Sequence, residues 1–370
     1  MKLTAFRHAL HQIPEIAFSE HKTKNLIVSY ISALPGFEDG AWKLHEFKNS
    51  PGVLLAYSRG KGSYKLFRAD MDALPIVEHS GCDYSSVHTG MMHACGHDVH
   101  MAILMGLIYR IAKDKTPANL LFLFQPAEEG KGGAQSILEE GMIQQYDVEC
   151  AIALHVASGM KPGTISSKAG IFFGIPQEFN VVFRGKQAHV AYPEQGINAL
   201  EAALDFFANM RKEISQIAKN DRVIYHVGKM SAGDIRNIIP AECILEGTHR
   251  SLKREIRDIM NRLTVDLANM SADKIGAKAE VELLCSYDAV VNNPILVDKL
   301  RVAATKLNIS YQEAETAMTG EDFGFFTTMY PGLLFWLGSG CDEPLHSDKF
   351  LPKDECMDAG VELLHYLAIR

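Results

Sequence analysis

The sequence lacks the features that mark nucleic-acid-binding and membrane proteins. It contains no run of Lys or Arg and no basic stretch interleaved with aromatic residues, and its formal net charge is −8. Nucleic acid is therefore not an expected partner, because binding to it depends on clustered positive charge. The longest apolar run, Met101 to Tyr109, has about half the length of a membrane span. The N-terminal stretch has no apolar core of signal-peptide length, so no membrane association is expected.

Cysteine is sparse and irregularly spaced. The seven cysteines form an odd and widely scattered set, which argues for reduced thiols in a cytoplasmic protein. Internal repeats and low-complexity segments are absent as well, and 47% apolar with 22% charged residues is ordinary for a globular protein. At 370 residues the chain is long for a single core, so two domains are expected.

The N-terminal part of the chain alternates between helical and strand patterns. The predicted elements are helices in 2–34 interrupted at Pro14, strands at 52–58 and 64–71, a helix at 98–113 with Asp98 as N-cap, a strand at 120–125, a helix at 134–141 and a strand at 150–156. The first two strands are expected to form a hairpin or to be neighbours. This order predicts a mostly parallel α/β sheet, whose ligands bind outside the carboxyl ends of the strands.

The pattern changes at about residue 175. Residues 175–287 show the order strand, helix, strand, strand, helix, strand, which predicts an inserted α+β domain of ferredoxin-like type. The α/β pattern resumes after Asn293-Pro294. The predicted fold class is therefore α/β, with a discontinuous catalytic domain around a mostly parallel central sheet, residues 1–174 and 288–370, plus the inserted domain.

Side chains that ligate metals follow the predicted strands. Cys95 and His97 are separated by one glycine, so a thiolate and an imidazole can point into one small volume. Three further donors, Glu129, His155 and His346, come at intervals that suit successive strand ends. These five side chains are too many for one tetrahedral ion that also binds water, but they suit two ions that share a bridging thiolate at Cys95.

Carboxylates beside these donors indicate the chemistry. In the pair Glu128-Glu129 one carboxylate can bind metal, while Glu128 faces a water molecule as general base. Asp70, at a strand end, can orient a ligand. The pattern thus predicts a two-metal hydrolase. One thiolate with imidazoles suits Zn²⁺, but geometry and availability decide, so Mn²⁺, Co²⁺ and Ni²⁺ stay open.

Each of these features also has an ordinary structural explanation. A Cys-x-His pair occurs by chance, Glu-Glu before Gly is usually a solvated turn, His155 could be a hydrogen-bonded core histidine, and Asp70 could cap a turn. His93, His100 and His249 are interpreted as local structural histidines. The joint placement of the donors at successive strand exits favours the metal site.

The inserted segment carries candidates for substrate contacts. His189 lies in a loop beside small residues and Arg250 at a strand end, and their ordinary interpretation is surface polarity. In the functional interpretation His189 stabilises the oxyanion of a tetrahedral intermediate, while Arg250 or the Asn237 region recognises a substrate carboxylate. Gly320, in the Gly-Glu-Asp loop, is a further candidate for substrate binding.

Motifs along nearly the whole chain resemble one family of enzymes. They are, in order, LHQIPEIAFSEHKT, RADMDALP, MMHACGHDVHM, QPAEEG, LHV, GKQAHVAYP, NIIPAE, EGTHRSL, GEDFG and PLHSDKF. Together they resemble the dinuclear-metal aminoacylase and carboxypeptidase family of metallopeptidases, in its amidohydrolase branch. That branch includes N-acetyl-diaminopimelate deacetylases, hippurate hydrolases and plant indole-acetyl-amino-acid hydrolases.

The resemblance implies a catalytic α/β domain interrupted by a lid and dimerisation domain, and hence a homodimer through the inserted domain. The residues that match the family's metal ligands, with the first of them bridging, are Cys95, His97, Glu129, His155 and His346. Glu128 matches the general base and Asp70 a supporting carboxylate. Arg68 stands where other branches have a ligating His, so His97 is expected to supply the imidazole that faces Asp70. His189 resembles the lid histidine that reaches the partner subunit's site.

The resemblance also implies the reaction. We expect a metal-dependent amide hydrolase that removes an N-acyl group from a small-molecule amino acid, with N-acetyl-diaminopimelate as the favoured substrate. Other N-acyl amino acids or small peptides are the alternative, because Gln187 and Lys131 depart from the family's commoner residues. A two-metal phosphoesterase and a catalytically silent metal- or amino-acid-binding protein are the competing classes.

Overall fold

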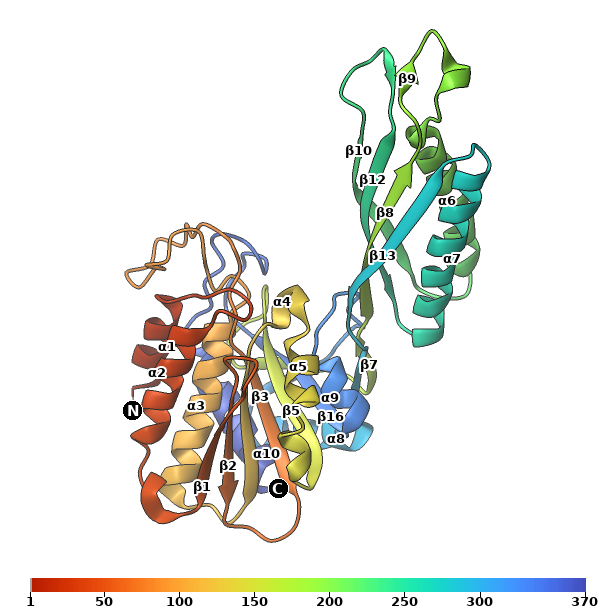
Figure 1. Ribbon diagram of the computed structural model, residues 1–370. Coiled ribbons are helices and arrows are strands. Elements are labelled where there is room, and N and C mark those ends of the chain that lie inside the picture. The colour runs from red at the N-terminus through yellow and green to blue at the C-terminus, as the bar shows by residue number, and fades with distance from the viewer. Residues whose placement is uncertain (1) are drawn as a thin grey trace. The chain divides into compact units, whose positions relative to one another are not determined.

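The computed structural model describes residues 2–370, and the chain divides into two compact units (Figure 1). Unit 1 comprises Met1–Phe172, Val290–Thr316 and Asp322–Arg370, and unit 2 comprises Phe173–Ala289 and Ala317–Glu321. The short segment Ala317–Glu321 thus clusters with the inserted part of the chain, whereas the sequence analysis assigned it to the other domain.

A ten-stranded sheet forms the centre of unit 1. Its strands are β1 (Trp42–Glu46), β2 (Val53–Ser58), β3 (Tyr64–Asp70), β4 (Asn119–Gln125), β5 (Val148–Ala157), β6 (Thr164–Ser167), β7 (Gly170–Phe173), β14 (Val290–Asn292), β15 (Ser310–Glu313) and β16 (Gly332–Gly338). The order is β1-β2-β4-β3-β5-β16-β14-β7, with β6 joining β16 to β15. Strands β4, β3, β5, β16 and β14 pair in parallel, and β1 and β2 add an antiparallel edge. The predicted mostly parallel sheet is confirmed.

Helices pack against this sheet. They are α1 (Leu3–His11), α2 (His21–Ser32), α3 (His97–Asp114), α4 (Glu128–Lys131), α5 (Gly133–Glu139), α8 (Pro294–Leu307), α9 (Gly324–Met329) and α10 (Cys356–Ile369), with short 3-10 turns η1 (Phe37–Asp39) and η2 (Ile143–Gln145). Helix α3 contacts both α1 and α10 as well as the sheet. Within residues 2–370 no helix is long and apolar enough to cross a membrane.

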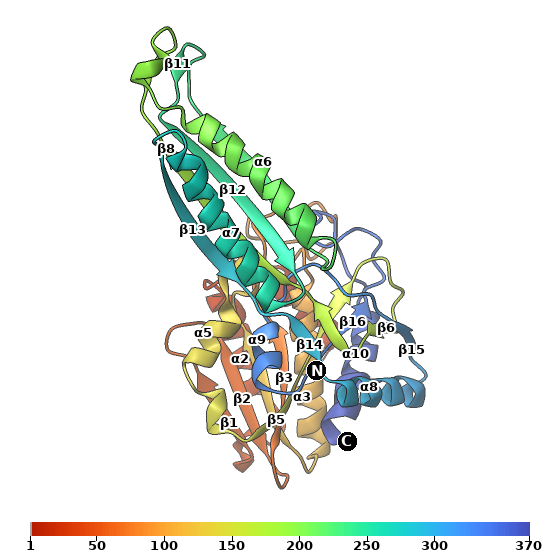
Figure 2. The same cartoon turned by 90° about the vertical axis from the view of Figure 1, so that its right-hand side faces the viewer.

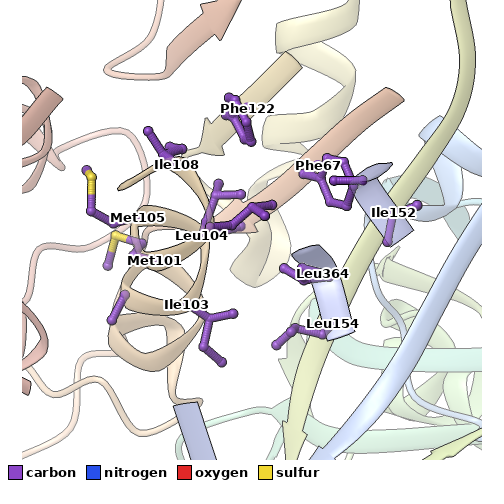
Figure 3. Packing of buried hydrophobic residues seen from close by; sticks show 14 of the residues in the cluster. Phe67, Met101, Ile103, Leu104, Met105, Ile108, Phe122, Ile152, Leu154 and Leu364 are labelled. Carbon is purple, nitrogen blue, oxygen red and sulfur yellow. The ribbon is translucent and has the colours of Figure 1, made fainter. Parts of the chain in front are cut away.

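The core of unit 1 explains why α3 is apolar on nearly every side. Leu104 and Ile108 of α3 lie in one buried cluster with Phe67 of β3, Phe122 of β4 and Leu364 of α10 (Figure 3). Each such side chain contributes about 1.5–3 kcal/mol through its removal from water. This core holds α3 against the sheet, and His97 is the first residue of the helix.

Two local predictions for unit 1 are wrong. Strands β2 and β3 are not neighbours, because β4 lies between them and pairs antiparallel with β2 and parallel with β3. A run that is apolar on both faces, such as β4, is most stable inside a sheet. Asp98 does not cap α3 either: the N-cap is Gly96 with φ 84°, and the Asp98 carboxylate binds Arg7 and His11 instead.

Unit 2 contains a four-stranded antiparallel sheet with two helices. Its elements are β8 (Ile175–Arg184), β9 (Ala188–His189), η3 (Pro193–Gln195), α6 (Ala199–Ile217), β10 (Ile224–Ala232), β11 (Ile238–Ile239), β12 (Glu242–Ser251), α7 (Arg254–Asp273) and β13 (Lys278–Ser286). The sheet order is β10-β12-β8-β13, and α6 and α7 lie side by side on it (Figure 2). Alternate residues of β8, Phe179, Val181 and Phe183, are fully buried. The predicted order of an α+β ferredoxin-like fold is confirmed.

Candidate metal centre

The parallel strands of unit 1 deliver polar side chains to one edge of the sheet. Strand β3 ends at Asp70, the Glu128-Glu129 pair follows β4, and His155 lies near the end of β5. Because neighbouring parallel strands end on the same side, these residues gather there. His346 comes from the segment after β16 and is tied to this edge, since its N–H donates to the Ala94 carbonyl at 2.9 Å.

The five predicted metal donors meet in two overlapping groups that share Cys95. One group is Cys95, His97 and His155, and the other is Cys95, Glu129 and His346; within each, the donor atoms lie no more than 4.8 Å apart. Cys95 Sγ is 3.4 Å from His155 Nε2, and His346 Nε2 is 3.2 Å from Glu129 Oε1. A thiolate at Cys95 therefore stands where it can serve two ions.

The imidazoles are oriented for metal binding. His97 Nδ1 donates to the Asp72 carbonyl and His155 Nδ1 to the Val156 carbonyl, both at 2.8 Å. These bonds leave Nε2 of each ring as the nitrogen directed to the group around Cys95. Among residues 2–370 the buried His97 Nε2 has no hydrogen-bond partner. Metal-bound histidines usually donate their second ring N–H in this way, so the donor set fits a metal centre.

The electrostatics of the pocket favour a cation. Burial raises the pKa of the Cys95 thiol well above its ordinary value, and the carboxylates of Glu129 and Glu128 raise it further. Burial opposes protonation of His97, but the carboxylates of Asp70, Asp72 and Glu129 together outweigh it and raise the pKa of that imidazole to about 10. The negative charge that raises the pKa values of Cys95 and His97 also attracts divalent ions, which can replace the protons on these two side chains.

The turn that carries Glu128 and Glu129 is held by two buried carboxyl groups. Ala127 has a left-handed backbone with φ 58°, and its N–H donates to Glu20 Oε1 at 2.8 Å. The Glu129 N–H donates to Asp72 Oδ2 at 2.9 Å. Sequence reasoning did not single out Glu20, because nothing in its own neighbourhood shows that α2 begins beside the Glu128 turn.

Asp70 is surrounded by basic groups, but the imidazole nearest to it is not the one that the sequence analysis expected. The sequence analysis assigned the facing imidazole to His97, whose Nε2 lies 3.8 Å from Asp70 Oδ2. His100 takes that place with Nδ1 at 2.6 Å from Asp70 Oδ1, while its Nε2 accepts the Val156 N–H. Both ring nitrogens of His100 are therefore used, and it orients Asp70. Burial would raise the pKa of Asp70, but the two imidazoles and Arg68 hold it well below its usual range.

A buried network locks the ends of β3 and β4 together. Arg68 donates to Asp70 Oδ2 at 2.7 Å, to Gln125 Oε1 at 2.9 Å and to Asp322 Oδ1 at 2.8 Å. Asp322 Oδ2 accepts from Gln125 Nε2 and from the Ala134 N–H. The Asp322 N–H in turn donates to Glu128 Oε1 at 3.2 Å. Asp322 was missed as a site residue although it lies in the GEDFG motif, because only the tertiary structure joins it to Arg68.

The remaining candidates lie in unit 2 and form two separate pairs. His189 is exposed and lies close to Asn237, because the Asn237 carbonyl accepts the N–H of the adjacent Val190 at 3.1 Å. Arg250 and Gly320 both lie beside Pro176: Arg250 pairs with it across β12 and β8, and a Cβ added to Gly320 would lie 2.4 Å from its ring. The two pairs are at opposite ends of β12.

A parallel α/β sheet with thiol, imidazole and carboxylate donors at its strand ends is the arrangement of a metal-dependent hydrolase. Comparison with known proteins gives the particular family. The model of peptidase family M20/M25/M40 matches residues 66–370, and the chain belongs to this family.

Relatives and solved structures agree with this assignment. The chain is 36% identical to N-acetyldiaminopimelate deacetylases from Bacillus cytotoxicus and Oceanobacillus iheyensis, covering 98% of this chain and 96% and 97% of those proteins. It is 27% identical to a Bacillus subtilis structure described as a dinuclear metal binding peptidase from the M20 family, with a TM-score of 0.83, covering 100% of this chain and 97% of that one. A structure from methicillin resistant Staphylococcus aureus has a TM-score of 0.90 at 24% identity and supports the fold alone.

Proposed function

We propose that this protein removes the acyl group from the nitrogen of an amino acid, with N-acetyl-diaminopimelate as the favoured substrate. The observation that carries the proposal is the convergence of two donor groups on Cys95, with Glu128 beside them. Relatives called N-acetyldiaminopimelate deacetylases, 36% identical over nearly the full chain, support the choice of substrate.

In this proposal two divalent ions occupy the centre. Cys95, His97 and His155 would hold one ion, and Cys95, Glu129 and His346 would hold the other. When bound, such a pair lowers the pKa of water and polarises an amide carbonyl. The single thiolate among imidazoles suits Zn²⁺, and Mn²⁺, Co²⁺ and Ni²⁺ are the other candidates.

Glu128 would move the proton. Its carboxylate is buried, and Oε1 accepts the Asp322 N–H, which keeps the side chain in one orientation. It would take a proton from water during attack on the carbonyl carbon and pass it to the nitrogen of the leaving amine. Asp70, kept ionised by its basic neighbours, would hold His100 and the nearby His97 in place.

Residues of unit 2 would contact the substrate. His189 Nδ1 accepts the Ala191 N–H at 3.1 Å, so the neutral ring carries its proton on Nε2. A donor of this kind is what an oxyanion requires, and we assign that role to His189. Arg250 or the Asn237 region would bind the substrate carboxylate, and Gly320 would let the substrate approach the backbone.

We also infer a homodimer through unit 2 and a cytoplasmic location. Strands β10 and β13 are edge strands of the unit 2 sheet, and Ile224, Leu283 and Leu284 on them are exposed. Exposed apolar side chains along sheet edges favour association with a second copy. Within residues 2–370 the cysteines form no disulfide, which agrees with a reducing compartment. Light scattering of the purified protein tests the dimer, and a monomer would contradict it.

The decisive experiment is a turnover screen of the metal-reconstituted protein. Free amine is measured with N-acetyl-diaminopimelate, other N-acyl amino acids and small peptides, and inorganic phosphate is measured with a phosphate ester. We expect the largest kcat/KM for N-acetyl-diaminopimelate and none for the phosphate ester. Hydrolysis of another N-acyl amino acid alone would overturn the substrate, and no amide hydrolysis with metal bound would overturn the function.

A further inference from the structure

A second group of metal-ligating side chains lies outside the centre described above. His11 of α1, Glu78 and Cys82 bring a ring nitrogen, a carboxylate oxygen and a sulfur within 4.8 Å of one another. The His11 side chain is fully buried and that of Glu78 is 4% exposed. These are therefore not the exposed acidic residues that often cluster without a ligand.

The distances within this group are those of ligands around one small ion. His11 Nε2 is 3.1 Å from Glu78 Oε1, and Cys82 Sγ is 3.8 Å from the same oxygen. Bonds of about 2.0 Å to N and O and about 2.3 Å to S in a tetrahedral site place ligand atoms about 3.3–3.5 Å apart, close to the distances found here. The corresponding distances in the Cys95 centre are 3.2 and 3.4 Å.

His11 is also oriented as metal-bound histidines are. Its Nδ1 lies 3.0 Å from Asp98 Oδ2, a buried carboxylate that Arg7 holds at 2.9 Å. A carboxylate on the far ring nitrogen fixes the ring and raises the basicity of Nε2, the atom that faces Glu78 and Cys82.

A divalent ion could enter without changing the charge of the group. His11 contacts the Asp98 carboxylate through one ring nitrogen and the Glu78 carboxylate through the other. Binding of M²⁺ would release the proton of His11 Nε2 and the proton of the Cys82 thiol, so the net charge of the group would stay the same. The ion would therefore bury no additional net charge.

The group joins a long irregular segment to two helices. Glu78 and Cys82 lie in the stretch from Pro75 to Met91, which contains neither helix nor strand. His11 ends α1 and Asp98 lies in the first turn of α3. A metal that closes such a long irregular segment onto two helices would stabilise it by restricting the unfolded chain.

We propose that His11, Glu78 and Cys82 form a third, mononuclear divalent-metal site, separate from the Cys95 centre and structural in role. One thiolate, one imidazole and one carboxylate select a borderline-soft ion such as Zn²⁺ over Mg²⁺ or Ca²⁺. Ser80 Oγ, 3.5 Å from Cys82 Sγ, or water would complete the coordination.

Cobalt titration of the metal-free full-length protein tests the proposal. We expect Cys82→Ser to bind one equivalent less than the wild type, while the control Cys341→Ser binds as much as the wild type. Cys341 is a suitable control because it is a partly exposed free thiol whose Sγ contacts only backbone groups. Equal stoichiometry for Cys82→Ser and the wild type would overturn the site.

Two further readouts separate this site from the Cys95 centre and from a merely reactive thiol. In Cys95→Ser the thiolate-to-cobalt absorption should persist, and it should vanish in the Cys82→Ser, Cys95→Ser double variant whether or not the protein hydrolyses any amide. Zn²⁺ should slow alkylation of Cys82 by iodoacetamide by about tenfold or more, because coordination occupies the nucleophilic thiolate. Alkylation at the same rate with and without Zn²⁺ would show an activated thiol and no metal site.

Discussion

At the scale of single residues, the candidate centre contains backbone conformations that ordinary sequences avoid. His346 has φ 66° and Ala127 has φ 58°, although both carry a Cβ. A residue in this region costs about 1–3 kcal/mol and persists only where its surroundings enforce it. The Ala94 carbonyl and the Glu20 carboxylate accept the N–H groups of His346 and Ala127 and enforce these turns. These turn conformations orient the His346 ring and the Glu128-Glu129 pair toward the candidate metal centre.

The role of Glu128 leads to a prediction at this scale. Glu128→Gln keeps an oxygen that can accept the Asp322 N–H but cannot take a proton from water. We expect kcat to fall by about 10²–10⁴-fold while metal content stays at the wild-type value. The control is Glu139→Gln on the exposed surface of α5, which should leave kcat unchanged. Steady-state kinetics together with metal analysis measure both effects, and full turnover by Glu128→Gln would remove the proposed mechanism.

At the scale of elements, the turn after β4 depends on α2. Glu20 precedes α2, is fully buried, and accepts the Ala127 N–H. Burial raises the pKa of Glu20 to about 8, and the neighbouring Asp72 carboxylate acts in the same direction. The native chain therefore keeps this proton to a higher pH than the unfolded chain does, so unfolding releases a proton between about pH 4.5 and 8.

This difference predicts a pH-dependent effect of Glu20→Gln. Because rising pH favours the state that releases the proton, Glu20 lowers the stability of the wild type as pH increases through that window. The uncharged Gln has no such dependence. The free energy of unfolding of Glu20→Gln relative to the wild type should thus rise with pH, by on the order of 1 kcal/mol per unit. Urea unfolding at several pH values measures it, and a difference independent of pH would contradict the buried, protonated state of Glu20.

Helix α3 provides a second prediction at the scale of elements. Leu104 is 1% exposed at the centre of the cluster in Figure 3. Leu104→Ala should lower the free energy of unfolding by about 2–5 kcal/mol, through lost burial and the cavity that remains. Val302→Ala on α8 is the control, since Val302 is 51% exposed and the change should stay within about 0.5 kcal/mol. Equal effects of the two substitutions in urea unfolding would contradict the described core.

At the scale of the whole molecule, all proposed metal ligands belong to unit 1. Cys95, His97, Glu129, His155 and His346 lie in its segments, and so do His11, Glu78 and Cys82. Unit 2 has its own apolar cluster, formed by β8, β12 and the two helices. Metal binding should therefore stabilise one unit directly and leave the core of the other intact.

Chelation tests this division. Removal of metal should speed amide hydrogen exchange at the start of α3 and at the end of β5, because bound ions stabilise only the folded state, by about 2.7 kcal/mol at a hundredfold excess over Kd. Helices α6 and α7 serve as the internal reference and should exchange at the same rate with and without metal. Added Zn²⁺ should restore the original pattern. Equal deprotection of both units would contradict the assignment of all metals to unit 1.

The sequence by itself predicted the main elements, the order of elements in unit 2 and the candidate donor residues, because periodicity and spacing are local properties. Only the tertiary structure decided the neighbours. Strand β4 between β2 and β3, His100 rather than His97 facing Asp70, and Asp322 joined to Arg68 all depend on contacts between distant segments. The same holds for Glu20 beneath the Glu128 turn and for Cys82 beside His11, since no local pattern reveals which buried groups share a space.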